Sequence, residues 1–357
     1  MIRSKMLFKK FGVLSVSNQT IIHVPVLLLH RSQLDSTQWD DFIAASPQQI
    51  LYAYSWYLDT VSPDWKALVL TQNGQWQAVM PLPCRQKWGL KVIQQPFFCQ
   101  LLGIFAHLNV DFQEASNLLL SHLTTSFRYV SIYTGRFAAQ TVFPNSLKIK
   151  KANNVVLPLH LPYAVLFQNY SNDRKTNLKR AQLFGWQSKQ STDIEPIIQL
   201  FQKNHSSQIA GGVSEKAYDL LRKITAVLAQ KKALRLVYAT KDGRIEAGAL
   251  FAIFENRIIY LFNAASPTGR KGNGRTWLID KIIQEYAGTD FVFDFESPEL
   301  PSIASFYQSF GGVEEIYTQF TFNDLPFPLK QIQNWRIEKS ARQQTTDNKS
   351  VKHTKKG

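Results

Sequence analysis

The sequence is poor in cysteine, with two among 357 residues. Cys84 and Cys99 lie in apolar surroundings and do not form a CxxC pair. A disulfide framework is therefore not expected, and the composition favours a reducing compartment, which we take to be the cytoplasm.

The sequence also lacks a hydrophobic run long enough to cross a membrane. The longest apolar stretch near the start, from Ile21 to Leu29, contains His23 and Pro25 and has no small-residue cleavage site after it. Such a run predicts a buried strand rather than a signal peptide or a membrane span. We therefore expect a chain without a membrane span.

Several catalytic signatures are missing. The seven histidines are scattered, without an HExxH motif or a His–Cys spacing suited to a metal, so no metal is expected. No Gly-x-Ser-x-Gly elbow is present, which removes support for serine hydrolase chemistry. His205 lies in a polar segment that either borders an acceptor cleft or is ordinary surface.

What the sequence does have is positive charge and apolar bulk. Its formal charge is +15, its pI is about 9.7, and it is 45% hydrophobic with 24 Phe. This composition predicts a globular protein of two domains that attracts anions such as nucleic acid, lipid or a phosphorylated small molecule. Part of the charge lies in residues 329–357, which we predict to be a disordered basic tail, and residues 1–20 are predicted to be flexible.

One arrangement of elements occurs twice. Asn73-Gly74 and Asp242-Gly243 each lie between two strand-like runs, a strong hairpin signal, and they are about half the chain apart. Helical patterns precede each hairpin, and a strand, a helix and a strand follow it. This order predicts an α/β (α+β) protein of two units, residues 21–160 and 161–328, each a mixed, mostly antiparallel sheet flanked by helices.

The second unit opens with a basic helix, "NDRKTNLKR", which Gly185 ends. Such a helix contacts RNA in some proteins and is a solvated face in most. We leave both interpretations open.

The segment "SPTGRKGNGRTWLIDKII" distinguishes the second unit from the first. Its glycines allow close backbone approach, and a helix is predicted to start near Gly274–Arg275, with its free N–H groups facing the glycines. Arg270 and Lys271 add positive charge. The segment is either an anion site or a basic turn, but it is neither a P-loop nor a dinucleotide-binding fingerprint, because the required spacings are absent.

The elements that follow favour a ligand. A strand, Phe291–Ser297, carries the acids Asp294 and Glu296 near its end. After it comes the short helical pattern "SIASFYQSFGG", which Gly311 caps, and then a closing strand.

The order of hairpin, strand "RIIYLFNAAS", glycine segment, helix, strand, "FYQSFGG" helix and closing strand resembles the GNAT N-acyltransferase fold. Two such units in tandem, with a basic helix opening the second, resemble the FemAB-like branch of that superfamily. As architecture the resemblance covers roughly residues 35–325, and its motifs lie within 246–320. The first unit would then be a degenerate GNAT-like unit.

The resemblance implies acetyl-CoA or another acyl-CoA as co-substrate, and no metal. In the family the strand before the glycine segment pairs with the pantetheine arm, and the loop amides hold the pyrophosphate. Carried over, the arm would lie along Asn263, Ala264 and Ala265, and the phosphates on Arg270, Lys271, Gly272, Asn273, Gly274 and Arg275. Tyr307 matches the tyrosine that often protonates the departing thiolate. One departure is that the family's Arg or Gln three residues before the first glycine of Gly-x-Gly is here Gly269.

Acyl transfer to nitrogen also needs a base. Glu246, Asp294 and Glu296 are the candidates, and each has a structural alternative as a solvent-facing strand residue or a loop cap. For Tyr307 the alternative is core packing.

We therefore expect an N-acyltransferase that moves an acyl group, in the first place acetyl, from acyl-CoA to an amine on a small molecule or peptide. The amine would attack the bound thioester directly. One alternative is a FemAB-like transferase that uses aminoacyl-tRNA to extend a cell-wall peptide. The other is a non-catalytic binding protein that retains the fold. The acceptor and the oligomeric state are not predicted.

Overall fold

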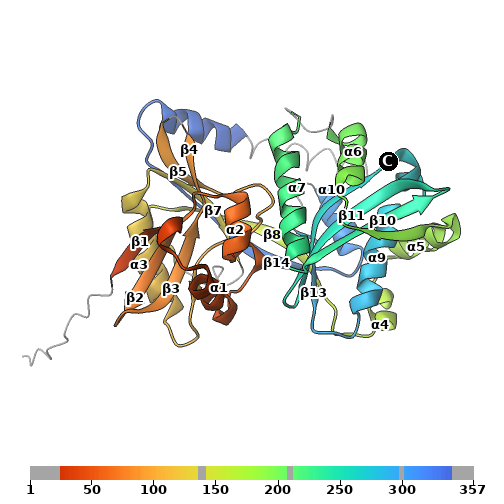
Figure 1. The fold of residues 1–357 in the computed structure, drawn as a ribbon, viewed down its shortest axis with the longest axis horizontal. Helices are drawn as coiled ribbons and strands as arrows, with labels where there is room; N and C mark the ends of the chain where they lie inside the picture. Colours follow the sequence, from red (N-terminus) through yellow and green to blue (C-terminus); the bar gives the residue numbers. More distant parts are fainter. Residues whose placement is uncertain (1–24, 88, 136–141, 207–211, 297–300, 340–357) are drawn as a thin grey trace, which may run out of the picture.

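The computed structural model describes residues 25–339, apart from residue 88 and residues 136–141, 207–211 and 297–300. The predicted flexible N-terminus, residues 1–20, lies outside the described residues. Figure 1 shows two bodies side by side, one built from the first half of the chain and one from the second.

The first body contains β1 (Val26–His30), η1 (Arg31–Gln33), α1 (Ser36–Ala45), η2 (Leu51–Ala53), α2 (Ser55–Val61), β2 (Lys66–Gln72), β3 (Gln75–Leu82), β4 (Cys84–Lys87), β5 (Leu90–Gln94), β6 (Phe105–Ala106), α3 (Phe112–Ser126) and β7 (Tyr129–Thr134). The second begins with β8 (Lys148–Pro158), α4 (Tyr163–Gln168), α5 (Asn172–Phe184), β9 (Gln187–Ser191), α6 (Glu195–Asn204) and α7 (Glu215–Gln230). It continues with β10 (Leu234–Lys241), β11 (Arg244–Phe254), β12 (Arg257–Ala265), α8 (Pro267–Lys271), α9 (Gly274–Tyr286), β13 (Val292–Asp294), α10 (Pro301–Gln308) and β14 (Val313–Asn323).

The two predicted hairpins are present, and their turns use the residues that the sequence indicated. Asn73 and Gly74 have φ of 52° and 76°, and Asp242 and Gly243 have φ of 50° and 74°. Positive φ at both central positions is the geometry of the type I′ turn, which matches the twist of paired strands. The α/β class, with sheets flanked by helices, is confirmed.

The strands form two sheets. A four-stranded sheet has the order β1-β2-β3-β6, and a ten-stranded sheet has the order β4-β5-β7-β14-β8-β13-β12-β11-β10-β9. The larger sheet runs through both halves of the chain, so the two units share it.

The halves exchange strands at the middle of this sheet. β8, which follows the first half, pairs antiparallel with β13, and β14, which follows the second half, pairs antiparallel with β7. β8 and β14 also pair with each other. The boundary predicted at residue 160 therefore cuts the chain just after a strand that lies in the sheet of the second unit. Local patterns cannot show this exchange, because each strand alone has the same alternation wherever it pairs.

One hydrophobic core continues from the first unit into the second. It lies around Trp39 and Trp65 in the first unit and reaches Leu221 and Leu228 of α7 in the second. Helices α2 and α7 face each other between the bodies (Figure 1) and are in contact. A second core fills the other face of the second unit, under α5, α9 and α10.

The run predicted as a buried strand, Ile21–Leu29, is described only from Pro25 on. There it forms β1, which among the described residues has β2 as its one neighbour and so lies at the edge of its sheet. Leu27 is 41% exposed, so the described part of this run is not fully buried.

The predicted disordered tail is helical at its start, over residues 329–339. Leu329 packs against a small cluster that contains Val92 and Leu325, and Gln333 Nε2 donates to Tyr129 Oη over 2.9 Å. These contacts anchor a helix whose composition is otherwise that of a solvated end. Residues 340–357 lie outside the described part. No described helix has both the length and the apolar character required to cross a membrane.

Candidate active site

A wedge opens in the ten-stranded sheet where β12 and β13 part. The two strands pair in parallel only from Arg257 to Ile259 on β12. β12 continues to Ala265, whereas the chain after β13 turns to β8, with Phe295 N donating to Val155 O over 3.0 Å. Among the described residues, the last six residues of β12 therefore have a strand partner on one side only.

The glycine segment after β12 folds as two helices, α8 and α9, in place of an open loop. Close packing requires glycine at two positions of this segment. A Cβ on Gly269 would lie 2.0 Å from Glu246 O, and one on Gly272 would lie 2.4 Å from Trp186, so neither position has room for a side chain. Trp186 Nε1 also donates to Gly272 O over 2.7 Å. The close approach expected of these glycines is thus made to the protein's own strand and aromatic rings.

Helix α9 begins at Gly274, as the sequence predicted, and its N-cap Asn273 has φ of 55°. The first N–H groups of a helix have no partner within the helix and carry the positive end of its dipole. Arg275, in this first turn, donates to Asn263 Oδ1 over 3.1 Å. This end of α9 is therefore positively polarised beside the wedge.

Some of the other predicted donor-site residues lie away from the wedge, and two of them lie at it. Arg270 donates to Ala265 O over 3.0 Å, and the ring Nε2 of His205 lies 3.2 Å from the same oxygen, so the end of β12 already has protein partners. Ala264 lies opposite Gly248 in the ladder with β11. Lys271 is exposed. Asn263 and Arg275 are the predicted residues that meet at the wedge.

Arg174 on α5, which the sequence did not single out as a ligand residue, lies against the same end of α9. It is 6% exposed, and its guanidinium donates to Ser309 Oγ over 2.8 Å and to Thr276 Oγ1 over 2.6 Å. Its Cζ lies 4.2 Å from the centre of the Phe306 ring, and Arg275 approaches that ring at 5.7 Å. In the described structure neither arginine forms an ion pair.

A buried guanidinium with only neutral partners is costly, because burial disfavours its charge. Burial, followed by repulsion from Arg275, lowers the pKa of Arg174 to about 10. Both effects are relieved when an anion binds between the two arginines. The pair and the start of α9 thus place positive charge beside the wedge, without a counter-ion among the described residues.

Glu296 lies at the exit of β13, next to this site. The residue is partly buried as a whole, but its carboxyl group is enclosed, and Oε1 accepts a hydrogen bond from the Tyr52 hydroxyl. The pKa of Glu296 is raised to about 8, chiefly by burial; the hydrogen bond from Tyr52 opposes this rise, and the charge of Asp294 adds a smaller contribution to it. A carboxyl with such a pKa exchanges a proton near neutral pH.

Tyr307 on α10 lies between the two features. Its ring stacks on Phe295 at 4.9 Å between centres and meets the Tyr260 ring edge-on at 6.3 Å. Burial and the charge of Glu296 raise its pKa, whereas Arg275 lowers it. The Tyr260 hydroxyl is buried and has no hydrogen-bond partner among the described residues.

The other two base candidates have structural partners. The Glu246 carboxylate accepts from the Ser266 hydroxyl, which ties β11 to α8, and it is roughly 16 Å along β12 from Tyr260 at strand spacing. Asp294 is fully buried and binds Arg257 at 2.7 Å and Asn154 Nδ2 at 2.9 Å. Glu246 is therefore separate from the wedge, and Asp294 lies beneath it.

One signal in the sequence was available for Arg174. It shares an i, i+4, i+7 stripe with Leu178 and Ala181, and an arginine on the apolar stripe of a helix has to have a partner or a ligand. No comparable signal marked Tyr52, which reaches Glu296 from 244 positions away in the chain.

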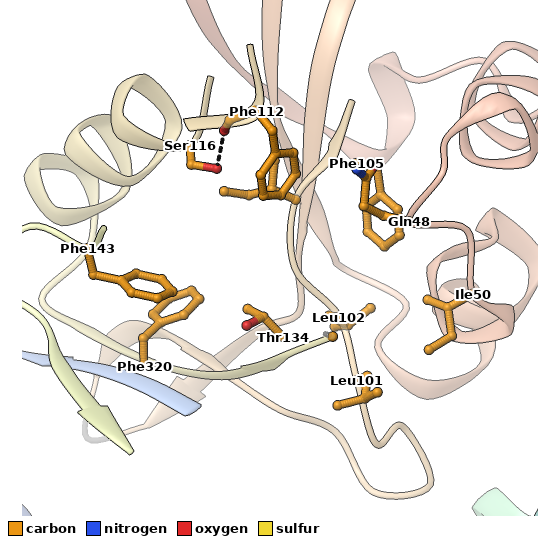
Figure 2. A pocket seen from close by; sticks show the side chains of 12 residues that line it. Gln48, Ile50, Leu101, Leu102, Phe105, Phe112, Ser116, Thr134, Phe143 and Phe320 are labelled. Carbon is orange, nitrogen blue, oxygen red and sulfur yellow. Dashed lines mark hydrogen bonds between the residues drawn. The ribbon is translucent and has the colours of Figure 1, made fainter. Parts of the chain in front are cut away.

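The corresponding place in the first unit, beside the end of β7, is an apolar cavity. Figure 2 shows Phe105, Phe112, Phe143 and Phe320 around it, with Thr134 and Ser116 as hydroxyl residues. No Lys, Arg, Asp or Glu is among the described residues that line it. Elsewhere in the described chain, no group of three His, Cys, Asp or Glu side chains is arranged to hold a metal ion.

Comparisons with known proteins bear on the domain type and on the fold. Residues 170–299 match the family described as acetyltransferase (GNAT) domain. The fold is similar to that of FemX, with a TM-score of 0.62 at 14% identity, covering 86% of this chain and 99% of FemX. It is also similar to a tandem GNAT protein from the clavulanic acid biosynthesis pathway, with a TM-score of 0.53 at 11% identity, covering 85% of this chain and 99% of that protein.

A conserved protein of unknown function from Bacteroides thetaiotaomicron VPI-5482 has a TM-score of 0.53 at 9% identity, covering 84% of this chain and 99% of that protein. No curated protein sequence matches the chain. At these identities the solved structures establish the fold, and the family match adds the domain type. Residues 170–299 therefore form an acyltransferase domain of the GNAT type, and the fold of the chain is that of tandem GNAT proteins.

Proposed function

We propose that the protein is an N-acyltransferase that moves an acyl group, in the simplest case acetyl, from acyl-CoA to an amine acceptor. The observation that carries the proposal is the arrangement at the wedge: an anion site on one side, and a carboxyl with a pKa of about 8 on the other. A thioester donor held by its phosphates at the anion site would extend along β12 towards Tyr307 and Glu296.

The donor's phosphates would bind to Arg174, Arg275 and the first amides of α9, at Gly274 and Arg275. Both arginines are held in place, by Thr276 and Ser309 in one case and by Asn263 in the other. A planar guanidinium group can donate two parallel hydrogen bonds to two oxygens of one phosphate. The pantetheine arm would follow Asn263 and the free side of β12.

In the reaction, the amine nitrogen attacks the thioester carbonyl carbon. A C–N bond forms, the C–S bond breaks, the Glu296 carboxylate takes the proton from the amine, and the Tyr307 hydroxyl protonates the thiolate. The raised pKa suits Glu296 to this role, since a base works best when its pKa is close to the working pH. We assign the reaction to the cytoplasm, which suits the two unpaired cysteines.

The likeness in fold to FemX supports a second candidate, an aminoacyl-tRNA-dependent transferase that acts on a cell-wall peptide. The anion site would then hold a phosphate near the tRNA 3′ end, and the leaving group would be a ribose hydroxyl instead of a thiol. The two candidates share the anion site and the base, and they differ in the donor.

Calorimetric titration with coenzyme A tests the first candidate and its anion site together. We expect Arg174→Gln to weaken binding by about 10- to 100-fold, because a charge-assisted hydrogen bond contributes about 1.5–3 kcal/mol. Arg180→Gln is the matched control, since Arg180 is exposed on the same helix.

Equal affinity in wild type and R174Q would remove Arg174 from the donor site. No binding of coenzyme A by the wild type, combined with binding of a tRNA acceptor stem that weakens steeply with salt, would replace acyl-CoA by the tRNA donor. Release of free thiol from acetyl-CoA only when an amine is present would establish the transfer itself. Binding of neither donor would leave the non-catalytic alternative.

A further inference from the structure

The carboxyl that we assign as the base is held by a residue of the other unit. Tyr52, in the short helix η2, is fully buried, and its hydroxyl donates to Glu296 Oε1. The two residues belong to opposite halves of the chain, so this bond joins the degenerate first unit to the reactive edge of the second.

The geometry of both partners is fixed by their surroundings. The ring of Tyr52 packs edge-on against that of Tyr57 at 5.4 Å between centres, inside the core that continues between the units. Glu296 has φ of 60°, which few side chains adopt, and its N–H donates to Asp294 Oδ1 over 2.9 Å. This turn directs the carboxyl away from β13, towards the first unit.

We propose that Tyr52 is a positioning residue of the acyltransferase, through which the first unit orients the Glu296 carboxylate towards the acceptor amine and helps to stabilise its charged form. The inference rests on the proposed function for the role of Glu296. It gives the first unit a part in catalysis although the described residues that line its own cavity carry no charge.

The groups that face Glu296 come from four further segments. They are Tyr57 on α2, Cys99 after β5, Asp294 on β13 and Tyr307 on α10. Cys99 is 3% exposed and has its pKa raised well above the usual value by burial, so it stays a neutral thiol. Tyr57 donates its hydroxyl to Phe98 O, away from Glu296. Among these neighbours, Tyr52 is the one whose hydroxyl donates to the carboxyl.

The direction of the effect follows from this arrangement. A hydrogen bond donated to a carboxylate stabilises the charged form, so it opposes the rise in pKa that burial causes. Removing the hydroxyl leaves the enclosed carboxyl without this donor. The Glu296 pKa in Tyr52→Phe should therefore rise above its wild-type value.

The test uses the full-length protein and two readouts. The carboxyl titration of Glu296 is followed by NMR with carboxyl-labelled glutamate, assigned by its loss in Glu296→Gln, and kcat/KM for acetyl transfer is measured from pH 6 to 10. In Tyr52→Phe we expect both midpoints to move upward by roughly one pKa unit, which lowers kcat/KM near pH 7 by about tenfold. Tyr54→Phe is the matched control, because its hydroxyl lies near Glu255 instead of Glu296.

An unchanged titration of Glu296 in a folded Tyr52→Phe variant would overturn the proposal, as would an equal shift in Tyr54→Phe. If the Glu296 titration shifts in Tyr52→Phe but the wild type transfers no acyl group, the link between the two units stands and the proposed function is overturned. If Tyr52→Phe does not fold, Glu296→Asp serves as the second test, because its side chain is one methylene shorter and its carboxyl lies farther from the Tyr52 hydroxyl. The pKa of this aspartate should be no lower than the pKa of Glu296 in the wild type. An ordinary aspartate pKa would contradict the proposal.

Discussion

The two units have a similar order of elements but differ in the side chains at the end of one strand, which is β13 in the second unit and β7 in the first. In the second unit, the wedge between β12 and β13 is bordered by Arg174, Arg275, Glu296 and Tyr307. In the first unit, the corresponding cavity beside β7 is apolar, and the hydroxyl of Thr134 donates to Thr318 O.

This difference separates architecture from chemistry. Both units have a hairpin followed by a strand, a helix and a further strand. Among the described residues, charged side chains lie at this place in the second unit, whereas the first unit has apolar ones. A fold provides a place for a ligand, whereas reactivity depends on the side chains placed there.

The largest expected effect comes from removing the base. Glu296→Gln keeps the size of the side chain but cannot accept a proton, so kcat/KM for acyl transfer should fall by about 10²- to 10⁴-fold. The corresponding exit of β7 holds Thr134 and Gly135, and Thr134→Val is the matched change there. Steady-state kinetics of both variants compares the two units directly. An equal loss in T134V would contradict the assignment of the chemistry to the second unit.

A second difference is the ionic support under the reactive exit. Arg257 binds the fully buried Asp294 at 2.7 Å and Glu315 at 2.7 Å. Arg257→Met leaves Asp294 as a buried charge without its cation, which should lower the free energy of unfolding by about 3–5 kcal/mol. Chemical denaturation measures this loss.

The control for that prediction is Arg128→Met, which removes the exposed pair between Arg128 and Asp324. Because its partners are 67% and 46% exposed, this pair should contribute no more than about 1 kcal/mol. If the two variants unfold at the same denaturant concentration, the Arg257 pair does not support the exit of β13.

The smallest effect is on stability as a function of pH. The folded protein raises the pKa of Glu296 from 4.5 to about 8, so the folded state binds this proton more tightly than the unfolded chain does. The associated stability is complete below about pH 4.5 and is lost as the pH rises to about 8. The thermal midpoint should therefore fall by roughly 5 °C more between pH 5 and 8.5 in the wild type than in Glu296→Gln.

The described residues that line the cavity of the first unit carry no charge, so we expect them to contribute nothing to this difference. Calorimetric melts of wild type and Glu296→Gln at the two pH values measure it. If the thermal midpoints of wild type and Glu296→Gln change equally between the two pH values, Glu296 has an ordinary pKa. The two units would then not differ in the titration of a buried carboxyl.

Much of the fold was predictable because it depends on neighbours in the sequence. Asn73-Gly74 turns a hairpin through its own φ angles, and Gly185 ends α5 with φ of 79°. The start of α9 was predictable for the same reason. The exchange of β8 and β14 was not, since it depends on which strand lies alongside, and alternation along a strand does not encode that.

The candidate site was only partly predictable. Tyr307, Glu296 and Arg275 could be marked from the pattern of elements, and the structure brings them to one wedge. Gly269 was interpreted as a place for close approach to a ligand, but the atom that approaches is Glu246 O. Close packing by the protein and close packing by a ligand require the same residue, so composition cannot separate them.

The strand exchange has a consequence for the order in which the chain is made. β7 pairs along one side with β14, which ends only at Asn323, near the end of the chain. During synthesis from the N-terminus, the first unit therefore cannot complete its part of the sheet until nearly all of the second unit has left the ribosome. A stop anywhere before β14 should leave β7 and β8 without the strand that lies between them, which would separate the two halves of the large sheet.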